Sequence, residues 1–221
     1  MSLKGKISIE KIVEKTAHNP AILFQIKDPL ILIPELLNIV LDTRITDIAY
    51  DYLGACPGIT YAKIVRNFSN KIPKFDTQYF HIDKHASKMF KVFIYLKDVK
   101  AGGGPHCFMK GSHTEKSKEN HWEKSTILPS TVSDESAIKM FGEGSLKKIY
   151  ASAGDIIIED TSGWHKAEKP ICFDRDVAII TYGIGKEYSY YWNGPGMNIL
   201  KNQFKSVKNK RILDFMEIID E

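Results

Sequence analysis

The chain has 221 residues, of which 43% are hydrophobic, so it can bury a full core and is most simply one domain spanning residues 1–221. Its 31 basic and 27 acidic residues are spread along the chain, which argues against the clustered positive charge of a nucleic-acid binder. The longest apolar run, from Pro29 to Pro34, is far shorter than the ~20 residues of a membrane-spanning helix. We therefore expect a protein that binds neither nucleic acid nor membrane.

The cysteines are odd in number and have no C-x-x-C spacing: they are Cys56, Cys107 and Cys172. This pattern predicts neither a disulfide framework nor a zinc cluster. The N-terminus also lacks the charged and then apolar pattern of a signal peptide. A cytoplasmic location is therefore expected.

The first quarter of the chain, from Ile7 to about Gly54, has the apolar spacing of helices. Ser8 begins a capping-box pattern, and an apolar stripe follows Pro34. Residues 1–58 are therefore expected to form helices that cover one side of a sheet.

From Ile59 onward the period changes to that of β-strands. The first predicted group of strands is Ile59–Phe68, Gln78–Asp83 and Met89–Leu96. A turn at Ala101–Pro105, a helical stretch at about Thr114–His121 and a polar segment through Glu143 separate it from a second group. The second group is Gly154–Glu159, the region of His165, and Arg175–Gly183.

The closing segment, from Asn198 to Ile219, has the spacing of a terminal helix, and its basic run Lys205–Arg211 is interpreted as a solvated helix face. Helices that flank two groups of short strands predict a mainly β fold, the double-stranded β-helix or jelly-roll barrel that cupins also use. Residues 59–183 are expected to form the barrel, and 184–221 a C-terminal segment with a helix. A ligand site is expected at the barrel mouth.

The tripeptide His81-Ile82-Asp83 is the first candidate for chemistry. Side chains alternate along an extended segment, so His81 and Asp83 point to the same face. His165 follows the predicted strand Gly154–Glu159, and we expect it to return to the barrel mouth near His81. Two imidazoles and one carboxylate make up the facial triad of non-heme Fe(II) oxygenases, which leaves the other coordination positions open for a co-substrate and O₂.

Arg175 follows at the start of an apolar strand. An arginine that enters a buried strand needs an anionic partner, and a carboxylate is the best match for its planar fork. Two explanations remain open, because the partner is either a bound carboxylate or one of the neighbouring residues Asp174 and Asp176.

The order of these blocks resembles the phytanoyl-CoA dioxygenase superfamily of Fe(II)- and 2-oxoglutarate-dependent oxygenases. The resemblance covers roughly Ile59 to Gly183 and rests on seven short blocks: His81-Ile82-Asp83, Lys91–Asp98, Gly104-Pro105, Gly111-Ser112-His113, Gly154-Asp155, His165 and Arg175. The segments before and after it match less clearly.

The resemblance implies a role for each matching residue. His81, Asp83 and His165 would hold Fe(II), and Arg175 would bind the distal carboxylate of 2-oxoglutarate. Strand parity and analogy with the family add three further candidates for co-substrate binding: Lys63, Asn67 and Lys91. O₂ would be the second co-substrate.

Asp83 also bears on the reaction. Related halogenases lack this carboxylate and bind a halide in its place, so its presence implies a hydroxylase rather than a halogenase. The expected reaction is hydroxylation of a small organic substrate, with release of succinate and CO₂.

Simpler explanations of single residues remain. In one alternative, His81 and Asp83 form only a surface ion pair. In another, His165 is simply a half-buried histidine beside Trp164. The aromatic run Tyr188–Trp192 is either packing or a substrate-facing lid. The remaining histidines, His18, His85, His106, His113 and His121, are not expected to be metal ligands.

Two other functions fit a jelly roll. One is a cupin-like metalloenzyme that does not use 2-oxoglutarate, and Arg175 distinguishes it because only the oxygenase needs this residue for co-substrate affinity. The other is a non-catalytic ligand-binding module, in which loss of Asp83 would leave ligand binding intact.

Overall fold

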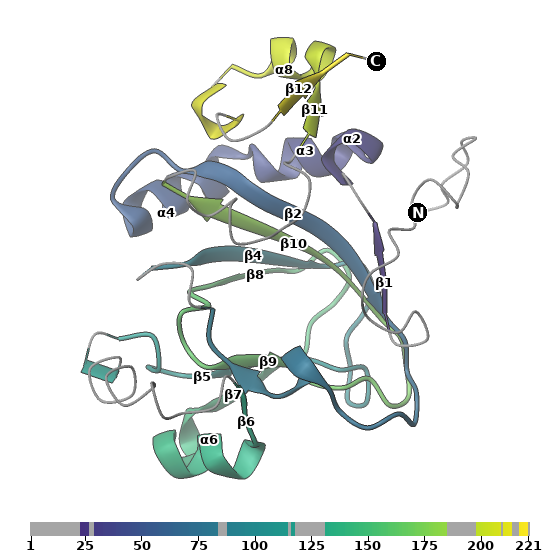
Figure 1. Ribbon diagram of the computed structural model, residues 1–221, viewed down its shortest axis with the longest axis vertical. Helices are drawn as coiled ribbons and strands as arrows, with labels where there is room; N and C mark the ends of the chain where they lie inside the picture. The colour runs from purple at the N-terminus through teal and green to yellow at the C-terminus, as the bar shows by residue number, and fades with distance from the viewer. Residues whose placement is uncertain are drawn as a thin grey trace.

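The computed structural model describes residues 23–26, 29–83, 88–114, 116–117, 131–184, 198–208, 210–213 and 217–220. Two antiparallel five-stranded sheets face each other (Figure 1). The larger sheet has the order β1 (Leu23–Ile26), β2 (Gly58–Asn67), β10 (Arg175–Gly183), β4 (Phe90–Tyr95) and β8 (Ile156–Glu159). The smaller has the order β6 (Thr131–Val132), β3 (Phe80–His81), β9 (His165–Ala167), β5 (His106–Met109) and β7 (Leu146–Ile149). This arrangement confirms the predicted jelly roll.

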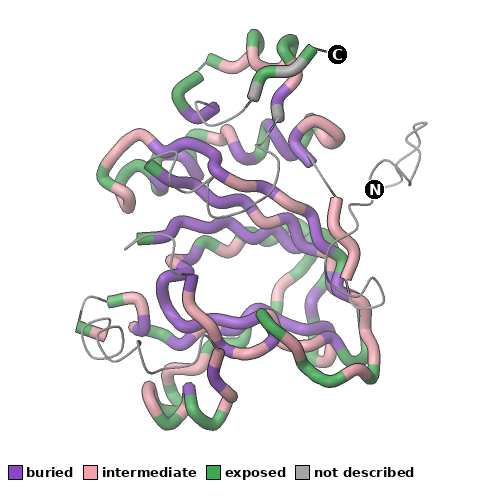
Figure 2. Tube along the Cα trace, in the orientation of Figure 1, coloured by how far each residue is buried: buried purple, intermediate pink, exposed green. Residues whose placement is uncertain are grey.

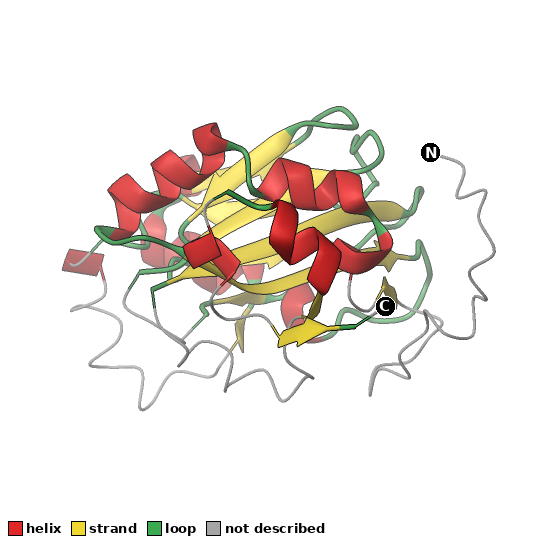
Figure 3. Ribbon diagram, turned by 90° about the horizontal axis from the view of Figure 1, so that it is seen from above, coloured by secondary structure: helices red, strands yellow, loops and turns green. Residues whose placement is uncertain are grey.

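Three helices cover the outer face of the large sheet (Figures 1 and 3): α2 (Pro29–Leu32), α3 (Pro34–Val40) and α4 (Thr43–Leu53). The side chain of Asp42 caps α4 by accepting a hydrogen bond from the backbone N–H of Arg44. Gly54 ends the helix in the left-handed region, at φ 79°. The predicted helical cover therefore exists, with clear start and stop signals.

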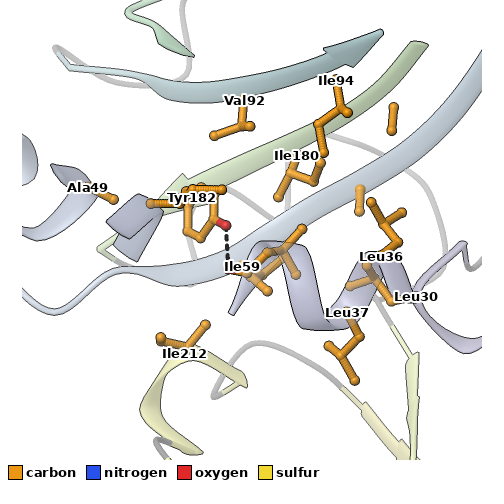
Figure 4. Close-up of a cluster of buried hydrophobic side chains, with 14 of the residues drawn as sticks. Leu30, Leu36, Leu37, Ala49, Ile59, Val92, Ile94, Ile180, Tyr182 and Ile212 are labelled. Atoms are coloured by element: carbon orange, nitrogen blue, oxygen red, sulfur yellow. Dashed lines mark hydrogen bonds between the residues drawn. The ribbon is translucent and has the colours of Figure 1, made fainter. Parts of the chain in front are cut away.

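The main hydrophobic core lies between these helices and the large sheet (Figure 4). Ile59 and Ile180 of the sheet pack there with Leu36 and Leu37 of α3. The hydroxyl of Tyr182 donates a 2.6 Å hydrogen bond to the carbonyl of Val40, so the sheet and the helix layer are also joined by a polar contact.

The inner face of the large sheet carries both apolar and polar side chains, and buried residues line the space between the two sheets (Figure 2). Val65, Phe93 and Val177 form an apolar cluster there. Since strand side chains alternate, the polar residues two positions away, Lys63 on β2, Lys91 on β4 and Arg175 on β10, share this face. The polar side chains thus project into the barrel and not toward the helices.

One prediction for the N-terminal region is wrong. The helical cover was expected from Ile7 to about Gly54, but Leu23–Ile26 is a strand that pairs with Ile64–Asn67 of β2. The segment Leu23–Ile26 pairs with the edge of β2, and this pairing outweighs the helical spacing of apolar residues in the surrounding sequence. Residues 1–22 lie outside the described part of the chain.

The C-terminal segment contains the predicted helix, but the helix is much shorter than predicted. α8 covers only Lys201–Ser206. In the chain it follows β11 (Asn198–Leu200) and precedes the 3₁₀ helix η3 (Lys210–Leu213) and β12 (Glu217–Ile219), and β11 and β12 pair in parallel. Gln203 donates a hydrogen bond to the carbonyl of Leu30, which ties α8 to the helix layer (Figure 1). Docking against α2 decides the local structure here.

The segment between the strand groups contains a helix that the sequence pattern did not predict, α6 (Asp134–Phe141). Ser133 caps it, and Ala137 is its one buried residue. The 3₁₀ helix η2 (Glu143–Ser145) follows α6, and a second one, η1 (Asp76–Gln78), precedes β3. Most of the helical stretch expected at Thr114–His121 lies outside the described residues. No helix among the described residues is both long enough and apolar enough to cross a membrane.

Candidate functional site

The structure brings His81, Asp83 and His165 together. His81 of β3 and His165 of β9 are register partners on adjacent strands, and their ring centroids are 4.3 Å apart. The chain turns after His81 so that the backbone N–H of Asp83 donates to the carbonyl of Thr161 at 2.9 Å. One ligand atom from each of the three side chains lies within 4.8 Å of the other two. This group is able to hold a metal ion.

Backbone carbonyls orient both imidazoles. Nδ1 of His81 lies 3.0 Å from the carbonyl of Tyr79, and Nδ1 of His165 lies 2.9 Å from the carbonyl of Gly163. Each Nδ1–H therefore donates to a carbonyl, which leaves Nε2 as the basic nitrogen. Nε2 of His165 is 3.7 Å from Oδ2 of Asp83, so it points to the centre of the group.

The protonation states also suit metal binding. Burial lowers the pKa of His81 and lowers that of His165 still further, and His81 adds to the effect on His165. Both imidazoles are thus neutral near pH 7. The neutral imidazole is the form that binds a metal.

The loop before His165 is packed tightly against β5 and its following turn. A Cβ at Gly163 would lie 2.8 Å from the ring of Phe108 and from Oγ of Ser112, so a larger residue would displace the loop. Oγ of Ser112 accepts a 2.7 Å hydrogen bond from the backbone N–H of Trp164. The Gly-Ser-His block thus has a structural contact with the loop that carries His165.

Asp83 is held by a buried lysine. Nζ of Lys91 donates to Oδ2 of Asp83 at 2.5 Å, and the two residues are 7% and 9% exposed. Burial alone would raise the pKa of Asp83, but the Lys91 ammonium and the nearby His165 lower it far below its usual value. The carboxylate is therefore ionised and available to a cation.

Arg175 lies buried at the start of β10, where its guanidinium is held by neutral oxygens. Nη1 donates to the carbonyl of Gly104 and Nη2 to Oδ1 of Asn67, both at 2.7 Å. Nε is buried and has no partner among the described residues. Burial lowers the pKa of Arg175, yet an arginine stays charged under these conditions.

The neighbouring aspartates do not neutralise this cation. Asp174 accepts hydrogen bonds from Ser69, and Asp176 pairs with Arg66 at 2.6 Å on the opposite face of the sheet. Among the residues that the structure describes, no carboxylate forms an ion pair with Arg175. Of the two explanations left open by the sequence, pairing with Asp174 or Asp176 is excluded.

The glycine that accepts from Arg175 is required by its surroundings. Gly104 has φ 71°, and a Cβ there would lie 2.6 Å from the carbonyl of Glu168. The turn before β5 therefore comes close enough for its carbonyl to meet the Arg175 guanidinium.

Lys63, Asn67 and Lys91 all lie in the barrel, as strand parity predicted. Asn67 faces Arg175 across the strand pair, and Lys91 contacts Asp83. Lys63 is half-buried, and burial, followed by repulsion from Lys91, lowers its pKa to about 8. The barrel interior thus carries three basic side chains, one of them beside the candidate metal ligands.

A buried pair was missed by the sequence analysis. Nε2 of His106 lies 2.6 Å from Oε2 of Glu159, and both side chains are 5% exposed. The one available signal was the alternation in Ile156–Glu159, which places Glu159 on the face of Ile157 that turns inward. The partner is on a different strand, and its identity is not readable from spacing.

Of the remaining histidines, His113 is the one that the structure describes. His113 is outside the group of candidate ligands, and its ring lies 6.0 Å from that of Phe108. His18, His85, His121 and the aromatic run Tyr188–Trp192 lie outside the described residues.

No protein-family model matches the chain, and no curated protein matches it. Solved structures do match. HygX from Streptomyces hygroscopicus, with nickel and 2-oxoglutarate bound, is 15% identical with a TM-score of 0.52 over 75% of this chain and 72% of its own. A second HygX structure, which also contains hygromycin B, is 15% identical with a TM-score of 0.50 over the same shares.

Two further structures show the same similarity. The non-heme α-ketoglutarate-dependent carbocyclase SnoK, from nogalamycin biosynthesis, is 17% identical with a TM-score of 0.55 over 78% of this chain and 69% of its own. EctD from S. alaskensis, with Fe bound, is 18% identical with a TM-score of 0.52 over 80% and 62%. The chain therefore has the jelly-roll fold of these solved structures, together with a His-Asp-His group that is able to bind iron.

Proposed function

We propose that this protein is an Fe(II)- and 2-oxoglutarate-dependent oxygenase. The observation that carries the proposal is the pairing of two features in one barrel. A His-Asp-His group lies between the sheets, and a buried arginine without a carboxylate partner among the described residues lies at the start of β10. 2-Oxoglutarate chelates a metal through its keto-acid end and keeps a free carboxylate at its far end. It therefore suits both the metal-binding group and the buried arginine.

In this proposal each residue has a defined role. His81, Asp83 and His165 hold Fe(II) through two Nε2 atoms and a carboxylate oxygen. Arg175 binds the distal carboxylate of 2-oxoglutarate, and its contacts with Gly104 and Asn67 fix the plane of its fork. The bound metal, with 2-oxoglutarate and O₂, supplies the oxidising power.

The charge inside the barrel supports a dianionic co-substrate. Lys63, Lys91 and Arg175 are basic, whereas Asp83 and Glu159 are the acidic residues described on the same inner faces. The basic groups exceed the acidic ones by one charge, and a divalent metal adds two more. Binding of 2-oxoglutarate offsets most of this excess, which favours its capture in a low-dielectric interior.

Lys91 has a second role in the proposal, in positioning. Its ammonium donates to Oδ2 of Asp83, and this oxygen also lies 3.7 Å from Nε2 of His165. Lys91 thus fixes the orientation of the carboxylate beside the other two candidate ligands.

Hydroxylation of a small organic molecule is the proposed reaction, with release of succinate and CO₂. Asp83 occupies the position that halogenases leave to a halide, which supports hydroxylation over halogenation. SnoK is described as a carbocyclase, so the same fold also serves a different oxidative outcome. The block order from His81 to Arg175 further supports a place among the phytanoyl-CoA dioxygenase-like enzymes.

Two further observations bear on the substrate class and the location of the protein. HygX binds hygromycin B, a small molecule, which supports a small-molecule substrate for the similar barrel of this chain. All three cysteines are free thiols, which supports a reducing, cytoplasmic location. We further propose that residues 1–221 act as a single domain.

Anaerobic addition of Fe(II) and 2-oxoglutarate to metal-free protein tests the proposal without knowledge of the substrate. The wild type is expected to develop the visible metal-to-ligand charge-transfer band of the chelate. Asp83→Ala should weaken or abolish the band, and Arg175→Ala should require far more 2-oxoglutarate to form it. Absence of a band in the wild type at saturating Fe(II) and 2-oxoglutarate would favour a cupin-like enzyme or a binding module instead.

A further inference from the structure

A buried histidine and a buried glutamate face each other beside the candidate metal ligands. They are His106 at the start of β5 and Glu159 at the end of β8, 2.6 Å apart through Nε2 and Oε2. A hydrogen bond joins the imidazole ring to the carboxyl group at this distance. The second oxygen, Oε1, is buried and has no hydrogen-bond partner among the described residues. Burying a carboxylate in this way is costly, so core packing alone does not explain the pair.

The ring of His106 lies directly against the site. Its centroid is 5.7 Å from that of His165, and the two planes are within 29° of each other. On another side it contacts Phe93, at 4.5 Å between centroids. His165 also lies 4.3 Å from the ring of His81. The ring of His165 is therefore in contact with the rings of two other histidines, and one of these, His106, belongs to no metal-binding group.

His106 is itself fixed at two points. The hydroxyl of Tyr95 accepts a 2.9 Å hydrogen bond from the backbone N–H of His106 and donates to the carbonyl of Ile149. Glu159 fixes the other end of the residue, at the tip of the ring. With the backbone and the ring both held, the plane of His106 is set independently of His165.

We propose that His106 and Glu159 are positioning residues for the metal ligand His165. Glu159 sets the plane of the His106 ring, and that ring in turn restricts the rotation of the His165 ring about its Nδ1 contact with Gly163. Nε2 of His165 is then aimed at the metal position before any metal arrives. The inference rests on the proposed function in that it takes the triad to be a metal site.

The test is a calorimetric titration of the metal-free full-length protein with Ni(II) alone. Glu159→Gln keeps an acceptor oxygen for His106 and should bind Ni(II) like the wild type. Glu159→Leu and His106→Leu should each bind about tenfold more weakly, the lower end of the losses seen when the supports of metal ligands are removed. His113→Leu is the matched control, because His113 lies outside the ligand group, and it should leave the affinity unchanged.

Glu159→Leu and His106→Leu each leave the other polar side chain buried without its partner, which could unfold the protein. A double variant avoids this problem. His106→Leu with Glu159→Met removes both polar groups and leaves an apolar filling, which is often neutral for stability. It should unfold at a similar temperature and still bind Ni(II) about tenfold more weakly. Recovery of wild-type affinity in the double variant would overturn the proposal, as would wild-type affinity in folded Glu159→Leu or His106→Leu.

The outcomes separate this inference from the proposed function. A wild type that binds Ni(II), but gives no charge-transfer band with Fe(II) and 2-oxoglutarate, overturns the co-substrate assignment and leaves the positioning pair standing. A wild type that gives the band, with variants that bind Ni(II) normally, overturns only the positioning pair. A wild type that fails to bind Ni(II) overturns both.

Discussion

Among single residues, Arg175 has the clearest expected effect. Its planar fork is already fixed by two neutral oxygens, and a bound carboxylate would complete its set of acceptors. Arg175→Met should therefore weaken 2-oxoglutarate binding by about 10- to 100-fold, the equivalent of about 1.5–3 kcal/mol for hydrogen bonds to a charged group. Arg175→Lys should recover only part of this, because lysine lacks the fork.

The measurement is an anaerobic titration of the charge-transfer band with 2-oxoglutarate. Arg66→Met is the control, since Arg66 pairs with Asp176 on the opposite face of the same sheet. Equal 2-oxoglutarate affinity in the Arg175→Met and Arg66→Met proteins would remove Arg175 from the co-substrate site. Ni(II) affinity should be unchanged in both.

Lys63 predicts a dependence of stability on pH. Its pKa is lowered from 10.5 to about 8 by burial and by Lys91, so below pH 8 the native state holds a charge that the fold disfavours. Between pH 8 and 10.5 the unfolded chain binds more protons at this group than the native chain does, and the free energy of unfolding rises with pH for this reason.

Lys63→Met in the metal-free protein should therefore be more stable than the wild type below pH 8, by about 2 kcal/mol. The difference should shrink to zero as the pH rises to 10.5. Urea unfolding at a series of pH values measures it, with the exposed Lys71→Met as the control. A difference that stays constant over this range would show that Lys63 carries no shifted pKa.

Among the secondary-structure elements, α6 is attached to the small sheet through an ion pair whose lysine is buried. Nζ of Lys166 is fully buried and donates to both oxygens of Asp134 at 2.7 Å, and it also lies 5.0 Å from the centroid of the Phe80 ring. Lys166 follows His165 on β9, so the two side chains point to opposite faces. The same strand thus presents the candidate metal ligand His165 inward and the anchor of α6 outward.

Asp134→Ala should destabilise the protein by about 2 kcal/mol, because it leaves the Lys166 ammonium buried without its carboxylate. The combination with Lys166→Met should regain at least half of this loss. Equilibrium urea unfolding measures both, and Glu135→Ala, exposed in the same first turn, is the control. A double variant no more stable than Asp134→Ala would show that the ion pair is not the main tie.

Strands with a strong apolar pattern were predictable from the sequence. β10 has the expected bounds, Arg175–Gly183, because the apolar run Val177–Ile180 marks a buried strand. The strand β1 was not predictable, because four residues carry too little pattern to outweigh helical neighbours. α6 was missed for a related reason, since its single buried residue, Ala137, gives no apolar stripe.

The candidate site was also predictable from the sequence only in part. The period of two predicted that His81 and Asp83 lie together, and they do, although β3 ends at His81 and a hydrogen bond to the carbonyl of Thr161 holds Asp83. The return of His165 to the same mouth follows from the jelly roll. The contact between His106 and Glu159 joins strands whose proximity depends on the closure of the whole barrel. Spacing along the chain carries no information about such a contact.

For the whole molecule, the two sheets are separate hydrogen-bonded layers of one barrel, so ligands that bind across the space between them should raise the stability of the entire fold. At a concentration 100 times the dissociation constant, a ligand stabilises the native state by about 2.7 kcal/mol. For a chain of this size that corresponds to an increase in Tm of roughly 5–10 °C.

The order of ligand addition makes this prediction specific. Ni(II) alone should raise Tm in the wild type and in Arg175→Met, and not in Asp83→Ala. 2-Oxoglutarate should give a further increase only when Ni(II) is present, and that second increase should be absent in Arg175→Met. Differential scanning fluorimetry measures both steps. If 2-oxoglutarate raised Tm equally with and without the metal, it would bind away from the triad, because a chelate needs the cation that His81, Asp83 and His165 are proposed to hold.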